Sequence, residues 1–124
     1  MKPYFLYIVA LFVLLSCNSS KNQLTNCNLK KITFNIKHFD DRGLYGDTKT
    51  AIDYEFCVPN NAETLKTISE IDSSIKPLNG KGRTKCKENH IIMIGNSYNK
   101  DIKKILCKLS QLDYITEINQ VFWE

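Results

Sequence analysis

Five cysteines are the most reactive side chains of this chain, and their spacing limits the chemistry that they can do. They stand at positions 17, 27, 57, 86 and 107, and no two of them form a CxxC pair. Structural zinc sites are normally built from closely spaced pairs of ligands. Cys86 and His90 have a spacing compatible with two ligands, but a surface histidine is the better interpretation. We therefore expect neither a metal nor a cofactor.

Two carboxylates form a second group that could do chemistry. Asp53 and Glu55 fall on one face of a predicted strand, which places them about 7 Å apart. Paired carboxylates can act as general acid and base, although on an antiparallel strand with one wet face they are usually only solvated. The chain has no GxSxG motif, and its only histidines are His38 and His90. We expect no enzymatic activity, and the alternative is a small envelope enzyme that uses Asp53, Glu55 or His90.

Two further groups could bind a partner. A basic, glycine-containing turn carries Lys81, Arg83 and Lys85 and could touch phosphate groups, although such turns are more often simply solvated. The chain ends with Phe122 and Trp123. Exposed aromatic side chains are common binding anchors, but an exposed pair also favours aggregation. We therefore expect Trp123 to pack at the edge of a sheet rather than to be presented to a partner.

The composition indicates one small domain without a nucleic-acid partner. The chain has 124 residues, with 17 basic and 13 acidic side chains. This length is enough for one domain with one core. The positive excess is too small to indicate binding to nucleic acid.

The N-terminal sequence has the layout of a secretory signal peptide. Residues 5–15 form an apolar run without a charge, which is shorter than the roughly 20 residues that a membrane-spanning helix needs. The border Leu14-Leu15-Ser16-Cys17 resembles the bacterial lipobox. The resemblance implies that Cys17 is lipidated and becomes the mature N-terminus after cleavage. It divides the chain into a signal peptide (1–16), a lipidated tether (17–26) and a single α+β domain (27–124).

The lipobox resemblance also implies a location. Its partner would be a membrane, reached through the N-terminal lipid, in a bacterial cell envelope. Asn18, rather than aspartate, follows the cysteine, which by resemblance to the lipoprotein sorting pattern favours the outer membrane, facing the periplasm. The alternative is an ordinary secreted protein whose signal peptide happens to contain a cysteine.

Hydrophobic periodicity predicts the elements that must position these residues. Residues 31–39 and 51–58 alternate apolar and polar side chains, as half-buried strands do. Residues 90–95 (HIIMIG) are apolar throughout, which indicates a central strand. A helix capped by Asn60 is expected between the second and third of these segments. The remaining elements expected are a short strand at 74–78, a helix at 100–112 and a closing strand at 114–123.

Without the first strand, the element order is βαββαβ. This order resembles the ferredoxin-like fold, an α+β sandwich in which both helices lie on one face of a four-stranded sheet. The extra N-terminal strand at 31–39 would then lengthen an edge of the sheet or cover its open face.

The cysteines that remain after Cys17 are expected to pair, because their number is even and the compartment is oxidising. In the proposed fold, Cys57 ends one strand and Cys86 precedes the antiparallel strand beside it. Both cysteines therefore lie at the same edge of the sheet. Cys107 points about 160° away from the apolar stripe of its helix, since successive residues turn by about 100°. Its partner must cross the helix from outside, and Cys27 remains for that role. The alternative is that two or more of these thiols stay free.

The last stretch, LSQLDYITEINQVFWE, resembles the end of subtilisin-propeptide-type inhibitor domains. In that family a helix, a turn and a final strand deliver the C-terminal tail to a protease. The resemblance implies a membrane-anchored, non-catalytic interaction or inhibitor-like module with an envelope protein as partner. Two alternatives remain, a small envelope enzyme and a purely structural envelope lipoprotein. The residues expected to take part in an interaction are Asp53, Glu55, Lys81, Arg83, Lys85, Phe122 and Trp123.

Overall fold

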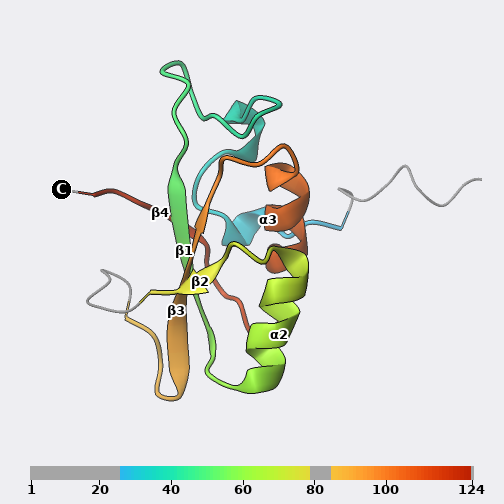
Figure 1. Ribbon diagram of the computed structural model, residues 1–124, viewed down its shortest axis with the longest axis vertical. Helices are drawn as coiled ribbons and strands as arrows, with labels where there is room; N and C mark the ends of the chain where they lie inside the picture. Colours follow the sequence, from blue (N-terminus) through green and yellow to red (C-terminus); the bar gives the residue numbers. More distant parts are fainter. Residues whose placement is uncertain (1–25, 79–84, 124) are drawn as a thin grey trace, which may run out of the picture.

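The computed structural model describes residues 26–78 and 85–123, in which two helices pack on one face of a four-stranded antiparallel sheet (Figure 1). The predicted α+β class is therefore confirmed. Two short 3₁₀ helices precede the sheet. The elements in chain order are η1 (Leu29–Lys31), η2 (Ile36–His38), β1 (Asp53–Pro59), α2 (Ala62–Ile71), β2 (Lys76–Pro77), β3 (His90–Asn96), α3 (Ile102–Ser110) and β4 (Asn119–Val121).

The strand order is β2-β3-β1-β4, so the two long strands form the centre of the sheet. β1 and β3 pair over seven residues, from Asp53 opposite Asn96 to Pro59 opposite His90. β4 pairs only with the first three residues of β1, and Val121 lies opposite Asp53. The sheet therefore has two distinct ends, which we call the Asp53 end and the His90 end.

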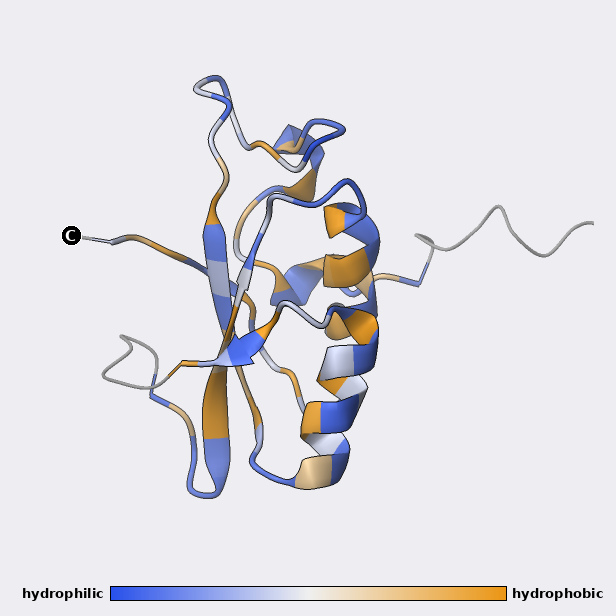
Figure 2. Ribbon diagram, in the orientation of Figure 1, coloured by the Kyte–Doolittle hydropathy of each residue, from blue (hydrophilic) through white to orange (hydrophobic). Residues whose placement is uncertain are grey.

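Alternation along β1 separates the core from the face without helices, as its sequence predicts. Tyr54, Phe56 and Val58 are buried between the sheet and the helices. Gly95 lies opposite Tyr54, and a Cβ atom there would meet the tyrosine ring, so only glycine leaves room for it. Figure 2 shows that the apolar residues of α2 and α3 are turned toward the sheet and their polar residues away from it. The core thus occupies a single layer between the helices and the sheet.

Both helices begin close to the predicted positions, but with different N-terminal residues. The carboxamide oxygen of Asn61 accepts a hydrogen bond from the backbone nitrogen of Thr64 at 2.8 Å, so Asn61 caps α2 and the expectation of Asn60 was wrong by one residue. Asp101 precedes α3 without a side-chain capping bond. The carboxamide of Asn99 instead accepts a bond from the backbone nitrogen of Asp101 at 2.8 Å.

The predicted strand at 31–39 is wrong. Ile32 forms an isolated parallel bridge with Ile118 and Phe39 an isolated antiparallel bridge with Tyr45, and between them the chain turns through η2. The side chain of Asn35 accepts a hydrogen bond from the backbone nitrogen of Lys37, which stabilises a local turn in place of a ladder. The alternating apolar residues are instead used in packing, since Phe34 and Phe39 meet edge to face and Phe39 is buried.

The loop between η2 and β1 is joined to the end of β3 through Ser97. The Ser97 hydroxyl donates to the carbonyl of Gly43 at 2.7 Å and accepts from the backbone nitrogen of Ile52 at 2.9 Å. Gly43 has a φ of 84°, and a Cβ atom there would collide with the backbone of residues 97 and 99. These contacts fix the segment that leads into the Asp53 end of the sheet.

Two disulfides join Cys27 to Cys107 and Cys57 to Cys86, with Cα–Cα distances of 4.7 and 5.6 Å. These are the two pairs that the predicted fold required. Cys107 is not exposed on the outer face of α3, however, because the segment around Cys27 covers it and leaves it 1% exposed.

Candidate functional site

The Asp53 end of the sheet carries a hydrogen-bonded group of side chains on the face without helices. Both carboxylate oxygens of Asp53 accept hydrogen bonds. Oδ1 accepts from the carboxamide nitrogen of Asn96 at 2.8 Å, and Oδ2 accepts from the indole nitrogen of Trp123 at 2.6 Å. The register of the sheet explains this meeting, because Asn96 and the end of β4 both lie beside the first residue of β1.

The C-terminal aromatic residues are exposed, and the expectation that Trp123 packs at the sheet edge was wrong. Phe122 and Trp123 are each 64% exposed. Figure 1 shows the chain after β4 leaving the sheet on the side opposite the helices. The indole of Trp123 is nevertheless held in place by its bond to Asp53. The tail is therefore both accessible and oriented.

A third exposed aromatic residue, Tyr98, is linked to the same group. Its backbone nitrogen donates to the carboxamide oxygen of Asn96 at 2.9 Å, so hydrogen bonds connect Tyr98 through Asn96 and Asp53 to Trp123. Tyr98 is 66% exposed. We call this set, which also includes the neighbouring Phe122, the Asp53 patch. It consists of Asp53, Asn96, Tyr98, Phe122 and Trp123.

The sequence reasoning missed Asn96 and Tyr98. A signal for them existed, because the predicted antiparallel pairing of 51–58 with 90–95 brings the start of one strand beside the end of the other. The polar and aromatic residues directly after HIIMIG therefore had to lie near Asp53.

Glu55 shares a face with Asp53 but not its environment. It is 5% exposed and lies opposite Ile94 on β3 and Asn119 on β4, so the expectation of a wet carboxylate is wrong at this position. His90 lies at the other end of β3 from Asn96. The structure thus separates Asp53 from His90, and it places Glu55 in a buried position between the two ends.

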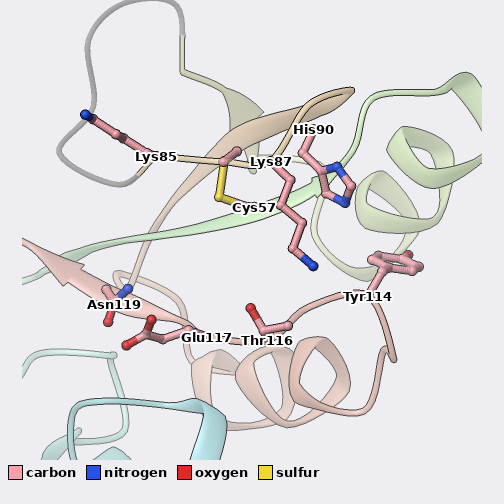
Figure 3. Close-up of a pocket in the computed structure, with 9 residues that line it drawn as sticks. Cys57, Lys85, Lys87, His90, Tyr114, Thr116, Glu117 and Asn119 are labelled. Atoms are coloured by element: carbon pink, nitrogen blue, oxygen red, sulfur yellow. A yellow bond between two sulfur atoms is a disulfide. The ribbon is translucent and has the colours of Figure 1, made fainter.

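The His90 end of the same face contains a pocket of about 150 Å³ beside the Cys57–Cys86 disulfide. Lys85, which the sequence singled out, is at its edge. Figure 3 shows Lys87 extending over the pocket toward Thr116, whereas Lys85 points away from it. The pocket is lined by Cys57, Lys85, Cys86, Lys87, His90, Tyr114, Thr116, Glu117 and Asn119.

Three predicted residues fall outside residues 26–78 and 85–123. They are Cys17, expected to carry lipid, and Lys81 and Arg83, expected in the basic turn. Within those ranges, no group of three or more histidine, cysteine, aspartate or glutamate residues is placed to hold a metal ion. No helix in the described part of the chain combines the length and apolar character needed to cross a bilayer.

A second hollow, of about 290 Å³, lies between the end of α2 and the outer side of α3. Lys104 and Lys108 line it together with Asp72. Nearby, the hydroxyl of Tyr54 and one carboxylate oxygen of Asp72 are buried without a hydrogen-bond partner among the described residues. Burial raises the pKa of Tyr54 above its ordinary value of 10.0, and the negative charge of Asp72 raises it further. The Tyr54 side chain belongs to the core, whereas Asp72 also lines the hollow.

Comparison with known proteins adds no relative. No family model matches the chain, and no curated protein or solved structure is significantly similar to it. The site must therefore be interpreted from its own geometry.

Proposed function

We propose that this chain is a lipid-anchored cell-envelope protein whose folded part is a non-catalytic protein-interaction module. The Asp53 patch is its binding surface, and the partner is another envelope protein. Cys17 carries the lipid, residues 1–16 are removed, and residues 17–26 tether the domain to the outer membrane on its periplasmic side.

One observation carries the proposal, namely that Trp123 is exposed and at the same time oriented by Asp53. Tryptophan and tyrosine are the residues most often found at energetic centres of protein interfaces. A side chain that is already held in one orientation loses less conformational entropy when it binds. The patch combines three exposed aromatic residues, Tyr98, Phe122 and Trp123, with the polar side chains of Asp53 and Asn96, and aromatic residues are enriched at interface cores.

The fold supports this use of the sheet. The strand order β2-β3-β1-β4, with both helices on one face, supports a ferredoxin-like arrangement. Within residues 26–78 and 85–123 no helix covers the opposite face, and the aromatic residues at its Asp53 end are exposed. The aromatic tail follows β4 directly, which is the position from which inhibitor-like domains of this type present their C-terminal tail.

The disulfides support the envelope location, because such bonds persist in oxidising compartments and are rare in the cytosol. Ten residues, the number from 17 to 26, span at most about 36 Å even when fully extended. The domain would therefore meet partners that lie at, or very near, the membrane surface.

The proposal is tested by affinity capture from detergent-solubilised envelopes with the full chain as bait. We expect the wild type to retain a stoichiometric protein and Trp123→Ala to lose it. Leu29→Ala is a matched control, because Leu29 is an exposed apolar residue, 49% accessible, on η1 rather than on the patch. A partner retained equally by Trp123→Ala would contradict the assignment of the surface. Absence of any partner would favour the structural lipoprotein or the small envelope enzyme.

A further inference from the structure

The surroundings of the Cys57–Cys86 disulfide favour a chemical reaction of this bond as well as a structural role. Both cysteines are half-buried, and both line the pocket at the His90 end of the sheet. We propose that this bond is a site of thiol–disulfide exchange, opened by a dithiol oxidoreductase, whereas Cys27–Cys107 is purely structural. The inference is independent of the Asp53 patch, which lies at the opposite end of the sheet.

The pocket gives an attacking thiolate both access and a favourable charge. A cysteine side chain of the oxidoreductase can enter the hollow of about 150 Å³ from solvent and reach the sulfur of Cys57. Cys86 lies between Lys85 and Lys87, and Lys87 extends over the pocket (Figure 3). A positive charge beside a cysteine favours its thiolate form. Glu117 is the one carboxylate among the residues that line the pocket, and it opposes this effect.

The bond that breaks is the one between the sulfurs of Cys57 and Cys86. A thiolate of the oxidoreductase attacks the sulfur of Cys57, a mixed disulfide forms there, and the bonding electron pair leaves on Cys86 as a thiolate. The second thiol of the oxidoreductase then loses its proton and attacks the mixed disulfide, which releases Cys57. Cys57 and Cys86 each take up a proton, so the chain gains two electrons and two protons while the oxidoreductase becomes the disulfide.

The position of Cys86 explains why it is the leaving group. Cys57 is held in β1, which pairs with β3 over seven residues, whereas Cys86 lies in the segment before β3, outside any helix or strand. The backbone nitrogen of Asn60 donates to the carbonyl of Asn89 at 2.8 Å, and this bond closes the same end of the sheet without the disulfide. We therefore expect the domain to stay folded when the bond is open, so that the exchange is reversible.

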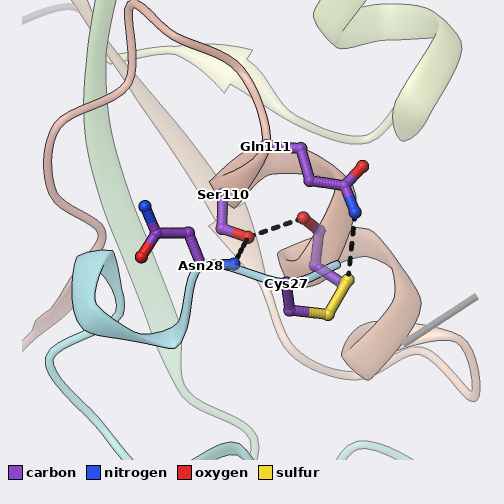
Figure 4. Close-up of a disulfide and its surroundings, with 5 residues drawn as sticks. Cys27, Asn28, Ser110 and Gln111 are labelled. Carbon is purple, nitrogen blue, oxygen red and sulfur yellow. Dashed lines mark hydrogen bonds between the residues drawn. A yellow bond between two sulfur atoms is a disulfide. The ribbon is translucent and has the colours of Figure 1, made fainter. Parts of the chain in front are cut away.

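The other disulfide has the opposite properties. Cys107 is 1% exposed, and its sulfur accepts a hydrogen bond from the carboxamide of Gln111 at 3.6 Å (Figure 4). Attack on Cys27 would generate the Cys107 thiolate at a buried position, where a charge is disfavoured. The backbone nitrogen of Asn28 also donates to the hydroxyl of Ser110 at 3.0 Å, which holds the two halves of the bridge together.

The two bonds can be compared in one molecule by reducing the full chain with dithiothreitol at neutral pH. Samples are quenched with an alkylating agent and mapped by peptide mass spectrometry. We expect Cys57 and Cys86 to be alkylated at least tenfold faster than Cys27 and Cys107, since access and thiolate stability both favour them. Equal rates, or earlier opening of Cys27–Cys107, would overturn the proposal.

Charge variants test the role of the pocket. Lys87→Gln should slow opening of Cys57–Cys86 about threefold, and Glu117→Gln should accelerate it by a similar factor. Lys66→Gln, at an exposed position on α2, should leave the rate unchanged. Identical rates in all three variants would contradict the electrostatic argument.

The chemical partner is tested with a dithiol oxidoreductase whose second cysteine is replaced by serine. This probe should trap a mixed disulfide on Cys57. An adduct on Cys86, or on Cys27, would overturn the assigned direction of attack.

Discussion

The indole nitrogen of Trp123 lies 2.6 Å from a carboxylate oxygen of Asp53, a residue 70 positions earlier in the chain. This contact joins the first residue of β1 to the tail that follows β4. It also restricts the orientation of an aromatic side chain that is otherwise exposed to solvent. The predictions below begin with this pair.

Asp53→Ala should release Trp123. The substitution removes two charge-assisted hydrogen bonds, from Asn96 and from Trp123, and because the site is open to solvent it should lower the free energy of unfolding by about 1–2 kcal/mol. Trp123 is the only tryptophan of the chain, so its fluorescence anisotropy reports on this side chain alone. We expect a clear fall in anisotropy in Asp53→Ala and none in Asp41→Ala, an exposed carboxylate in the loop after Phe39. Unchanged anisotropy in both variants would show that the contact does not hold in solution.

Deletion of residues 122–124 should leave the domain almost as stable as before. Phe122 and Trp123 are mostly exposed, so their removal sacrifices little buried apolar surface, and Val121 still completes β4. We expect the melting temperature to change by less than about 3 °C and capture of the envelope partner to be lost. A fall of many degrees would mean that the tail is packed on the domain.

Tyr54→Phe should stabilise the domain or leave its stability unchanged. The substitution removes a buried hydroxyl without a described partner, which is worth up to about 1 kcal/mol. Because burial and then the charge of Asp72 raise the pKa of Tyr54, the unfolded chain ionises this residue near pH 10 while the folded chain keeps its proton. The domain therefore keeps its stability below pH 10 and loses stability as the pH rises above 10, because ionisation of Tyr54 then favours the unfolded chain.

Chemical denaturation at pH 8 to 11 measures this effect. Tyr54→Phe should flatten the alkaline loss of stability, and the control Tyr98→Phe, at an exposed site, should follow the wild type. Parallel curves for Tyr54→Phe and the wild type would contradict the assignment.

Cys107→Ser should reduce the free energy of unfolding under oxidising conditions by about 2–4 kcal/mol, because the Cys27–Cys107 bond closes a segment of 80 residues. Cys27 should become accessible to alkylation, while Cys57 and Cys86 stay protected in the absence of reductant. Urea denaturation and peptide mapping check the two effects. Equal alkylation of Cys27 in both proteins would contradict the pairing.

Cys17→Ala should abolish incorporation of labelled fatty acid and leave the precursor unprocessed, because the proposed lipid is attached to this thiol. Serine at position 20 offers a control, since Ser20→Ala alters the tether without touching the border at Cys17. Normal labelling of Cys17→Ala would refute the lipid anchor.

Local patterns in the sequence were sufficient for the two central strands and both helices. Along β1, the apolar residues Tyr54, Phe56 and Val58 alternate with other residues, and this pattern predicts which side chains face the core. The continuous apolar run of β3 predicts a strand in the centre of the sheet. The two disulfide pairs could also be predicted from the sequence. The predicted order of elements brings together the segments that carry the two cysteines of each pair.

What depended on tertiary contacts was decided only by the folded structure. Residues 31–39 alternate like a strand, but the segment meets the C-terminal part of the chain in a single bridge, between Ile32 and Ile118 just before β4, so local turns prevail. Asp53 and Glu55 lie on the same face of one strand, but Glu55 is buried in the middle of the sheet, whereas Asp53 lies at its end. Exposure of Trp123 and its bond to Asp53 depend on where β4 stops. A periodic pattern predicts the secondary structure that one segment prefers. Burial and strand pairing depend instead on the neighbouring elements that pack against that segment.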